Sequence, residues 1–112
     1  MHMTREQLEK WLDDVLGEEA VLLADGLEEA FVGVGERWHE SEDGGATRLV
    51  VAVYDIDKCI EVLMRDGMSH EEADEFFVFN TLGAYVGPQT PIFIRRFSHD
   101  LEAVLPVSHA QA

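Results

Sequence analysis

Hydrophobic positions in the second half of the chain predict a strand, a helix, a tight turn, a second helix and a second strand, in that order. Residues 49–54 form a continuous apolar run rich in β-branched side chains, which is typical of a buried central strand. Apolar residues then recur at helical spacing in 56–64 and again in 70–86, on either side of a polar turn at 66–69. The apolar residues 92–94 are expected to pair beside 49–54. This strand-helix-turn-helix-strand unit is the predicted centre of the fold.

The first half of the chain mixes helical and extended patterns. Residues 4–16 place their apolar side chains on one helical stripe, and Thr4 and Gln7 have the spacing of a capping box, so a helix is expected there. Residues 21–23 are apolar and are interpreted as a short edge strand or a buried link. Residues 27–38 are compatible with a helical stripe and with a strand, because two glycines in the run weaken a helix. The helix is favoured for this segment.

Together these elements predict one α+β domain, residues 4–105, with three or four helices packed on a small sheet of two or three strands. A chain of 112 residues has the length of a single domain. Residues 1–3 are interpreted as a cloning remnant or a disordered start, and residues 106–112 as a disordered tail. The acidic, glycine-containing stretch 40–47 is expected to be a flexible loop.

The helix predicted at 70–86 changes character along its length. Its first turn is acidic, which suits the positive end of a helix, whereas residues 76–86 are apolar on nearly all sides. A helix with this pattern is buried or presents a face to a partner. A homodimer formed through residues 76–86 is therefore one interpretation. Asn80 lies inside this apolar run and is expected to be a buried amide with a structural role.

The charge of the chain says more about its partners than its overall composition does. The sequence has 23 Asp and Glu against 8 Lys and Arg, a formal net charge of −15 at pH 7, and the acidic residues are not confined to a tail. Such a surface repels nucleic acid and anionic membranes and attracts basic protein surfaces. No apolar run approaches the ~18 residues of a membrane span, and the start lacks a signal-peptide pattern. The single cysteine allows no intrachain disulfide, which fits a reducing cytoplasm.

The two helices predicted between residues 56 and 86 have a helix-turn-helix outline. The second helix of a DNA-binding motif of this kind must present Lys or Arg to phosphates and base edges. Here the first turn of that helix carries four carboxylates and no basic residue. Direct binding of nucleic acid is therefore not expected, and the pair is interpreted as two packed helices.

Candidate catalytic and metal-binding residues form no recognisable cluster in the sequence. His70 and Asp74 share one helix face, but a further ligand would have to come from elsewhere, such as His39. Asp55 is expected to cap the helix that follows it. Cys59 lies on the apolar stripe of that helix and is expected to belong to the core. No catalytic residue, metal or cofactor is therefore predicted.

Carboxylates along predicted helix faces indicate a surface that imitates a phosphate backbone or otherwise meets a basic groove on another protein. The expected partner-binding residues are Glu28, Glu29, Glu71, Glu72, Asp74 and Glu75. The alternative is a small enzyme or ligand-binding protein with a pocket between the aromatic helix and the segment around residue 25. Its candidate residues are Asp25, Tyr54, Asp55, Asn80 and Tyr85. A third interpretation is that the acidity serves only solubility.

Five segments of the chain carry a resemblance to known proteins. They are 25–34 (DGLEEAFVGV), 52–55 (AVYD), 59–69 (CIEVLMRDGMS), 79–87 (FNTLGAYVG) and 90–94 (TPIFI). Together they resemble a group of small acidic proteins of unassigned function that are encoded by tailed bacteriophages. The resemblance carries no known chemistry and transfers no functional residue. It implies a phage or prophage origin, action in the bacterial cytoplasm and, by analogy of class, inhibition of host defence, as anti-CRISPR proteins do.

The sequence as a whole predicts a non-enzymatic, acidic binding protein. We expect it to occupy a basic, nucleic-acid-handling surface on a host protein, because its charge is strongly negative and no catalytic cluster is present. A pocket-bearing enzyme or ligand-binding protein is the first alternative. A structural homodimer is the second.

Overall fold

The computed structural model describes residues 3–97 and has an α+β fold, as the sequence predicted. Most of the start predicted at 1–3, the last part of the predicted domain (98–105) and the tail predicted at 106–112 lie outside the described residues. The elements are α1 (Arg5–Leu16), the 3-10 turn η1 (Glu28–Ala30), β1 (Phe31–Glu40), β2 (Ala46–Asp55), α2 (Ile56–Arg65), α3 (His70–Phe77), the π-helical turn η2 (Val78–Leu82) and β3 (Ile92–Ile94).

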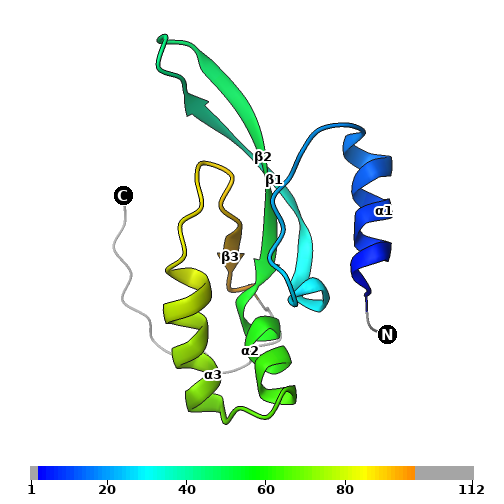
Figure 1. The fold of residues 1–112 in the computed structure, drawn as a ribbon, viewed down its shortest axis with the longest axis vertical. Helices are drawn as coiled ribbons and strands as arrows, with labels where there is room; N and C mark the ends of the chain where they lie inside the picture. Colours follow the sequence, from blue (N-terminus) through cyan, green and yellow to red (C-terminus); the bar gives the residue numbers. More distant parts are fainter. Residues whose placement is uncertain (1–2, 98–112) are drawn as a thin grey trace.

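The three strands form one mixed sheet in the order β1-β2-β3 (Figure 1). Strands β1 and β2 are antiparallel and pair from Phe31 opposite Tyr54 to Glu40 opposite Ala46. Strand β3 runs parallel to β2, with Phe93 opposite Tyr54, so the expected pairing of 92–94 beside 49–54 is confirmed. A parallel pair needs a long connection between its strands, and α2, α3 and η2 supply it.

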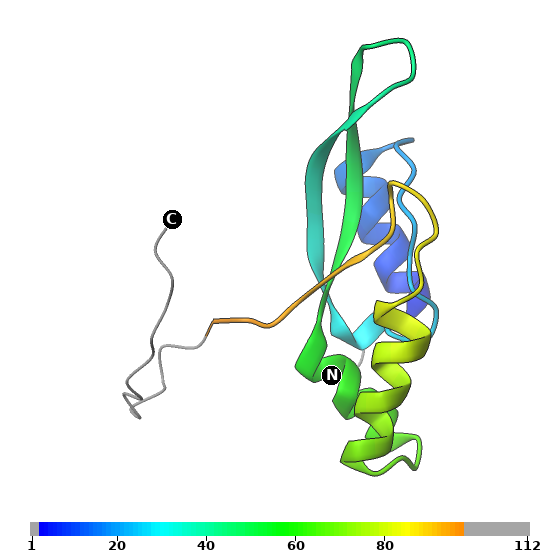
Figure 2. The same cartoon turned by 90° about the vertical axis from the view of Figure 1, so that its left-hand side faces the viewer.

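The molecule has two layers over much of its length. Figure 2 shows α1 and α3 on the same side of the sheet, and the end of the β1–β2 hairpin extends past the helices. Helices α1 and α3 therefore cover one face of the sheet, and α2 follows directly from the end of β2. Most of the buried side chains between these layers come from β2, α2 and α3, and they form one continuous cluster with Leu27 and Ala30.

A chain of aromatic rings joins five elements through the core. Trp11 of α1 contacts Phe31 of β1, whose ring meets Tyr54 of β2; the ring centroids are 5.9 Å and 5.7 Å apart. Tyr54 stacks on Phe93 of β3 at 5.6 Å, and Phe93 meets Phe77 of α3 edge-on at 5.2 Å. Such pairs stabilise by about 0.5–1.5 kcal/mol beyond the area they bury.

The helices begin where the sequence predicted side-chain caps. The Thr4 hydroxyl accepts from the Gln7 backbone N–H, and the Gln7 side chain accepts from the Thr4 backbone, which completes a capping box. Ser69 and Glu72 form the same box at α3. The Asp55 carboxylate accepts a backbone N–H at the start of α2. Each cap satisfies a donor that the first helical turn leaves without a partner.

The helix favoured for residues 27–38 is wrong. Only Glu28–Ala30 is helical, as a single 3-10 turn, and Phe31–Glu40 is a strand. The strand forms because β1 pairs with β2 from Phe31 to Glu40, with a bulge between Phe31 and Gly33, and this tertiary pairing outweighs the local helical stripe. Gly33 and Gly35 would each weaken a helix by about 1 kcal/mol, and Gly33 has a φ of 157° at the bulge, which is not a helical value.

The predicted helix at 70–86 is too long, and its apolar residues are less buried than expected. Regular α-helix ends at Phe77, and η2 continues it only to Leu82. The Gly83 N–H donates to the Val78 carbonyl at 3.0 Å, and a Cβ on Gly83 would lie 3.1 Å from that oxygen. Only Ala73 and Phe77 are buried in α3. The residues beyond Phe77 therefore turn outward and do not enter the core.

We expect Phe77→Ala to lower the free energy of unfolding by about 3–5 kcal/mol, because it removes a fully buried ring that contacts Phe93. Phe79→Ala is the matched control, since the Phe79 side chain is 79% exposed. That control should change stability by no more than about 0.5 kcal/mol. Urea unfolding followed by tryptophan fluorescence measures both. Equal losses in the two variants would contradict the assignment of Phe77 to the core.

Candidate functional site

A groove of about 330 Å³ lies between the segment that precedes η1 and the chain that follows α3. Its first wall consists mainly of apolar residues of the segment 22–27, together with Asp25. The opposite wall is formed by Asn80, Thr81, Ala84, Val86, Thr90, Pro91 and Phe93. The groove is thus mostly apolar, and its polar lining consists of one carboxylate, one amide and two threonines.

Hydrogen bonds to the sheet hold both walls of this groove. The Ala24 backbone N–H donates to the Tyr54 hydroxyl at 2.8 Å, which ties the first wall to β2. The Gln89 side-chain amide donates to the Ala20 carbonyl at 2.9 Å and to the Val50 carbonyl at 3.1 Å. It therefore joins the chain after α3 both to β2 and to the segment that leads into the first wall. The groove is fixed by bonds that do not depend on a ligand.

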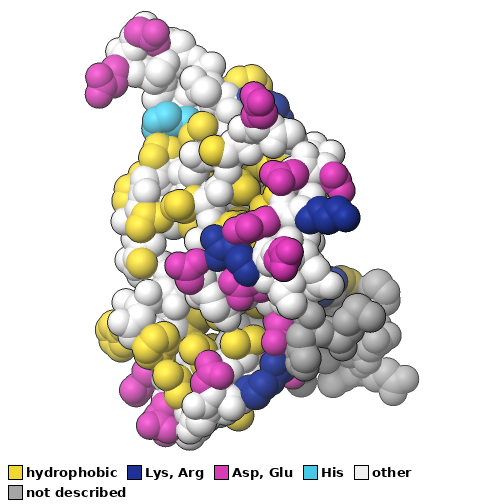
Figure 3. All heavy atoms as spheres, turned by 45° about the vertical axis from the view of Figure 1, so that its right-hand side comes forward, with side chains coloured by type: hydrophobic (Ala, Val, Ile, Leu, Met, Phe, Trp, Pro, Cys, Tyr) yellow, Lys and Arg dark blue, Asp and Glu magenta, His cyan; other side chains and the backbone are white. Residues whose placement is uncertain are grey.

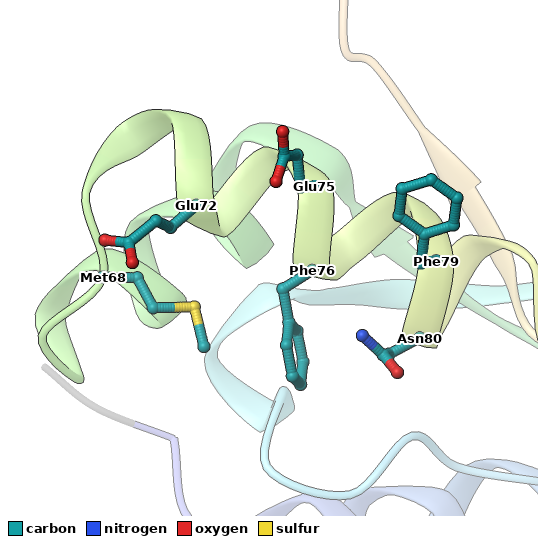
Figure 4. A pocket seen from close by; sticks show the side chains of 6 residues that line it. All are labelled: Met68, Glu72, Glu75, Phe76, Phe79 and Asn80. Carbon is teal, nitrogen blue, oxygen red and sulfur yellow. The ribbon is translucent and has the colours of Figure 1, made fainter.

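A second hollow, of about 390 Å³, lies along α3 and adjoins the groove (Figure 4). Figure 4 shows Met68, Phe76 and Asn80 pointing to one side of the helix, whereas Glu75 and Phe79 point to the other. Asn80 lines both hollows. The two hollows therefore meet at Asn80, and together they run from the acidic start of α3 to the segment around Asp25.

The four carboxylates of α3 are exposed and lie within five residues of one another: Glu71, Glu72, Asp74 and Glu75. In residues 3–97, no Lys or Arg forms an ion pair with any of them. The Ser69 backbone N–H, which donates to Glu72, lowers the pKa of that carboxyl below its usual value. The start of α3 is therefore a fixed concentration of negative charge.

The other two predicted partner-binding residues lie in a different environment. The Glu29 carboxylate receives two hydrogen bonds from Arg65, at 2.9 Å and 2.7 Å, and the Glu28 carboxylate lies 3.5 Å from Arg5. Their side chains are only 22% and 18% exposed. Each of these carboxylates is partly neutralised by an arginine. They do not extend the open acidic face of α3.

Most basic residues are paired away from α3. Six of the eight Lys and Arg form ion pairs with carboxylates in the described chain: Arg5, Arg48, Lys58, Arg65, Arg95 and Arg96. The two arginines that follow β3, Arg95 and Arg96, form ion pairs with the carboxylates of Asp57 and Asp55. On the face shown in Figure 3, hydrophobic side chains gather beside Asp and Glu side chains.

The five residues predicted for a ligand pocket do not converge on one cavity. Asp25 and Asn80 line the groove, and Asp25 also lies 2.6 Å from Arg5. Tyr54 is fully buried in the core, and Asp55 caps α2. Tyr85 is 76% exposed and lines neither hollow. The expectation of a buried Asn80 is wrong, because its side chain is exposed at the junction of the two hollows.

Cys59 occupies the core, as the sequence predicted. Its side chain is completely buried, and this burial raises the pKa of the thiol to about 12. Within residues 3–97, no group of three or more His, Cys, Asp or Glu side chains could hold a metal ion. None of the helices in that range is long and apolar enough to cross a bilayer.

Sequence reasoning placed a candidate pocket between the aromatic helix and the segment around residue 25, and a groove lies between these two segments. It did not identify the apolar residues that line this groove, because it extended one regular helix to residue 86. The outward turn after Leu82 is what brings Ala84 and Val86 opposite Leu22. Gly83 was the available signal, since glycine is a poor residue for a helix interior.

No protein-family model matches this chain, no curated protein matches it in sequence, and no solved structure matches it. The resemblance to phage proteins, and the function which that resemblance implies, stay predictions.

We expect Tyr54→Phe to lower the free energy of unfolding by about 1–3 kcal/mol, because the Ala24 N–H loses its acceptor. Hydrogen exchange of the Ala24 amide should accelerate, and this would report the release of the first groove wall. Tyr85→Phe removes the same hydroxyl from an exposed position and serves as the control. If the Ala24 amide exchanged at the same rate in Tyr54→Phe and the wild type, this hydrogen bond would not hold the wall.

We expect the folded protein not to react with Ellman's reagent at about pH 8. With a pKa of about 12, roughly one Cys59 thiol in ten thousand is ionised at that pH, and the side chain is buried as well. In guanidinium the same thiol should react rapidly and completely, because unfolding exposes it and returns its pKa to the ordinary range. Rapid reaction of the folded protein would show that Cys59 is accessible.

Proposed function

We propose that this chain is a non-enzymatic binding protein that uses the acidic face of α3 to occupy a basic, nucleic-acid-handling surface of a host protein. The observation that carries the proposal is the group of four exposed carboxylates at the start of α3, which have no basic partner in the described residues. A rigid helix presents them, so little conformational entropy is lost when a partner binds.

Electrostatics supports a basic protein as the partner. A net charge of −15 repels nucleic acid and anionic lipid, whereas a cationic surface is attracted over roughly the Debye length. Surfaces that bind DNA or RNA are the most strongly basic protein surfaces, because they must neutralise phosphates. A group of fixed carboxylates can compete for the same Lys and Arg side chains.

The geometry of the polar residues favours binding over catalysis. An enzyme site needs a nucleophile or a general base within hydrogen-bonding reach of further polar groups. Here Tyr54 and Asp55 have structural partners, and the thiol of Cys59 is sealed in the core. The groove is mostly apolar with a few polar residues, a lining that suits recognition.

The phage resemblance, if taken with this surface, narrows the proposed partner. It suggests action in the bacterial cytoplasm against a host nucleic-acid-handling complex, as an inhibitor of the anti-CRISPR-like class. This narrower proposal rests on the resemblance of the five segments and not on the geometry of α3.

A homodimer is the second candidate, because several apolar side chains after α3 are exposed. Phe79, Tyr85 and Val86 are 79%, 76% and 61% exposed. A dimer through these residues would bury them, but it would also bring two acidic α3 helices close together. Light scattering at micromolar concentration decides between the two states: a dimer at moderate salt supports this candidate, and a monomer opposes it.

We expect neutralisation of α3 to abolish partner binding. The test variant carries Glu71→Gln, Glu72→Gln, Asp74→Asn and Glu75→Gln, and Gln at position 72 keeps the capping box. The control carries Glu6→Gln, Asp13→Asn, Asp14→Asn and Glu18→Gln, which removes the same charge without touching α3. Tagged proteins are incubated with nuclease-treated bacterial lysate and eluted with a salt gradient.

The wild type and the control should retain the same nucleic-acid-binding protein, which double-stranded DNA should displace. The α3 variant should retain at least tenfold less of it. Equal retention by all three proteins would show that the charge of α3 is not the binding determinant.

A further inference from the structure

We infer that the groove beside Asn80 receives an apolar side chain of a cationic peptide segment, so that the partner is recognised by an apolar anchor flanked by Lys or Arg. This inference rests on the proposed function and deepens it. Charge on α3 alone would attract many basic surfaces. An apolar anchor in an adjoining groove would select among them.

Along the two hollows, acidic, aromatic and apolar lining residues follow one another in a fixed order. The hollow along α3 begins at Glu72 and continues past the ring of Phe76 to Asn80 (Figure 4). The groove then runs from Asn80 between Leu22 and Val86. A bound segment would thus meet carboxylates first, an aromatic surface next and an apolar groove last.

The size and rigidity of the groove suit a short side chain. Its volume, about 330 Å³, is at the lower end of the range for ligand pockets, about 300–1,000 Å³. Tyr54 and Gln89 hold its two walls to the sheet. A groove fixed in this way loses little entropy when it is filled, so burial of one or two apolar groups can contribute net affinity.

The charges around the hollows are complementary to a cationic occupant. Glu72 and Glu75 line the hollow along α3 and have no basic partner among residues 3–97, and neither hollow is lined by Lys or Arg. Asp25, in the groove, is paired with Arg5, so the open negative charge lies on the α3 side. Amphipathic segments that bind in grooves present apolar anchors three or four residues apart with charged residues between them. In a cationic segment of this kind, the Lys or Arg side chains would lie near the carboxylates while the anchor is buried.

The same charges oppose a second copy of this chain as the occupant. Each copy carries a net charge of −15, and two of the four carboxylates of α3, Glu72 and Glu75, line the hollow that would be covered. Like charges placed across an interface cost several kcal/mol. A cationic partner gains from the charge that a second copy would have to overcome.

Asn80 has a position and a chemistry that fit the junction. Its exposed amide has both donors and acceptors, so it can pair with the backbone or side chain of an occupant. It lies in the π-helical turn η2, and such turns occur frequently at functional sites. Asn80 is also the one asparagine in the chain, so the side-chain amide signals that disappear in Asn80→Asp identify it among those of the three glutamines.

Two synthetic peptides of equal charge test the inference on the full chain. One alternates pairs of lysines with pairs of leucines over about twelve residues, and the other has serine in place of every leucine. Fluorescence anisotropy measures their affinity at low salt, and NMR follows the Asn80 side-chain amide. The leucine peptide should bind at least tenfold more tightly and should shift the Asn80 signals. Equal affinities, or unmoved Asn80 signals, would overturn the inference.

Filling the groove provides the second arm of the test. Ala84 is exposed and lines the groove, so Ala84→Trp should occupy it and weaken the leucine peptide at least tenfold. Leu82→Trp is the matched control, because Leu82 is 49% exposed and lines neither hollow. Leu22 is 41% exposed and lines the groove. Leu22→Ser removes an apolar side chain from one wall and should also weaken binding of the leucine peptide. If Ala84→Trp and Leu22→Ser both bound like the wild type, the groove would not be the site.

The two proposals fail in different ways. If the α3 charge variant loses both peptides while Ala84→Trp retains the leucine peptide, the proposed electrostatic function is supported and the proposal that the groove binds an apolar anchor is wrong. If the α3 variant still binds the leucine peptide as the wild type does and Ala84→Trp does not, the groove is supported as the binding site and the proposed electrostatic function is wrong.

Discussion

The ring contacts of Tyr54 are the constraint on which the rest of the fold depends. Its ring lies between Phe31 and Phe93, so one residue of β2 fixes the neighbouring strands on either side. Trp11 and Phe77 extend the contacts to α1 and α3. Because the Tyr54 side chain is completely buried, its hydroxyl requires a partner within the protein, and the Ala24 N–H provides one. The core therefore also positions a wall of the groove.

The same arrangement explains why the chain after α3 carries exposed apolar side chains. Phe77 is the last fully buried residue of the helix, and the next ring that belongs to the core is Phe93. Between them, Gln89 holds the chain to the sheet through backbone carbonyls, and no buried aromatic side chain does so. The intervening residues can thus face outward without loss of the core.

Local features of the fold were predictable, and of the features that depend on distant partners the pairing of 92–94 beside 49–54 was predicted correctly whereas the strand at 31–40 was not. The helix caps at Thr4 and Ser69 follow from short-range hydrogen bonds, so their spacing in the sequence was sufficient. The stripe that suggested a helix at 27–38 was misleading, because β1 gains its hydrogen bonds from β2 and not from its own residues. The burial of Asn80 was predicted wrongly for a related reason. Its side chain is exposed because regular helix ends at Phe77 and the chain beyond that residue turns outward. Of the candidate site, the acidic start of α3 and the approximate place of a pocket near residue 25 were predicted from the sequence, whereas most of the residues that line the groove were not.

Charge and hydrophobic surface have opposite effects on self-association in this protein, and their combination constrains what it can bind. Exposed apolar side chains favour association with almost any apolar surface. The net charge of −15 opposes association between copies, and the open carboxylates of α3 concentrate that opposition beside the apolar residues. The partner that we propose therefore supplies positive charge and an apolar side chain together. An acidic surface without the groove would lack selectivity, and the groove without the acidic surface would favour aggregation.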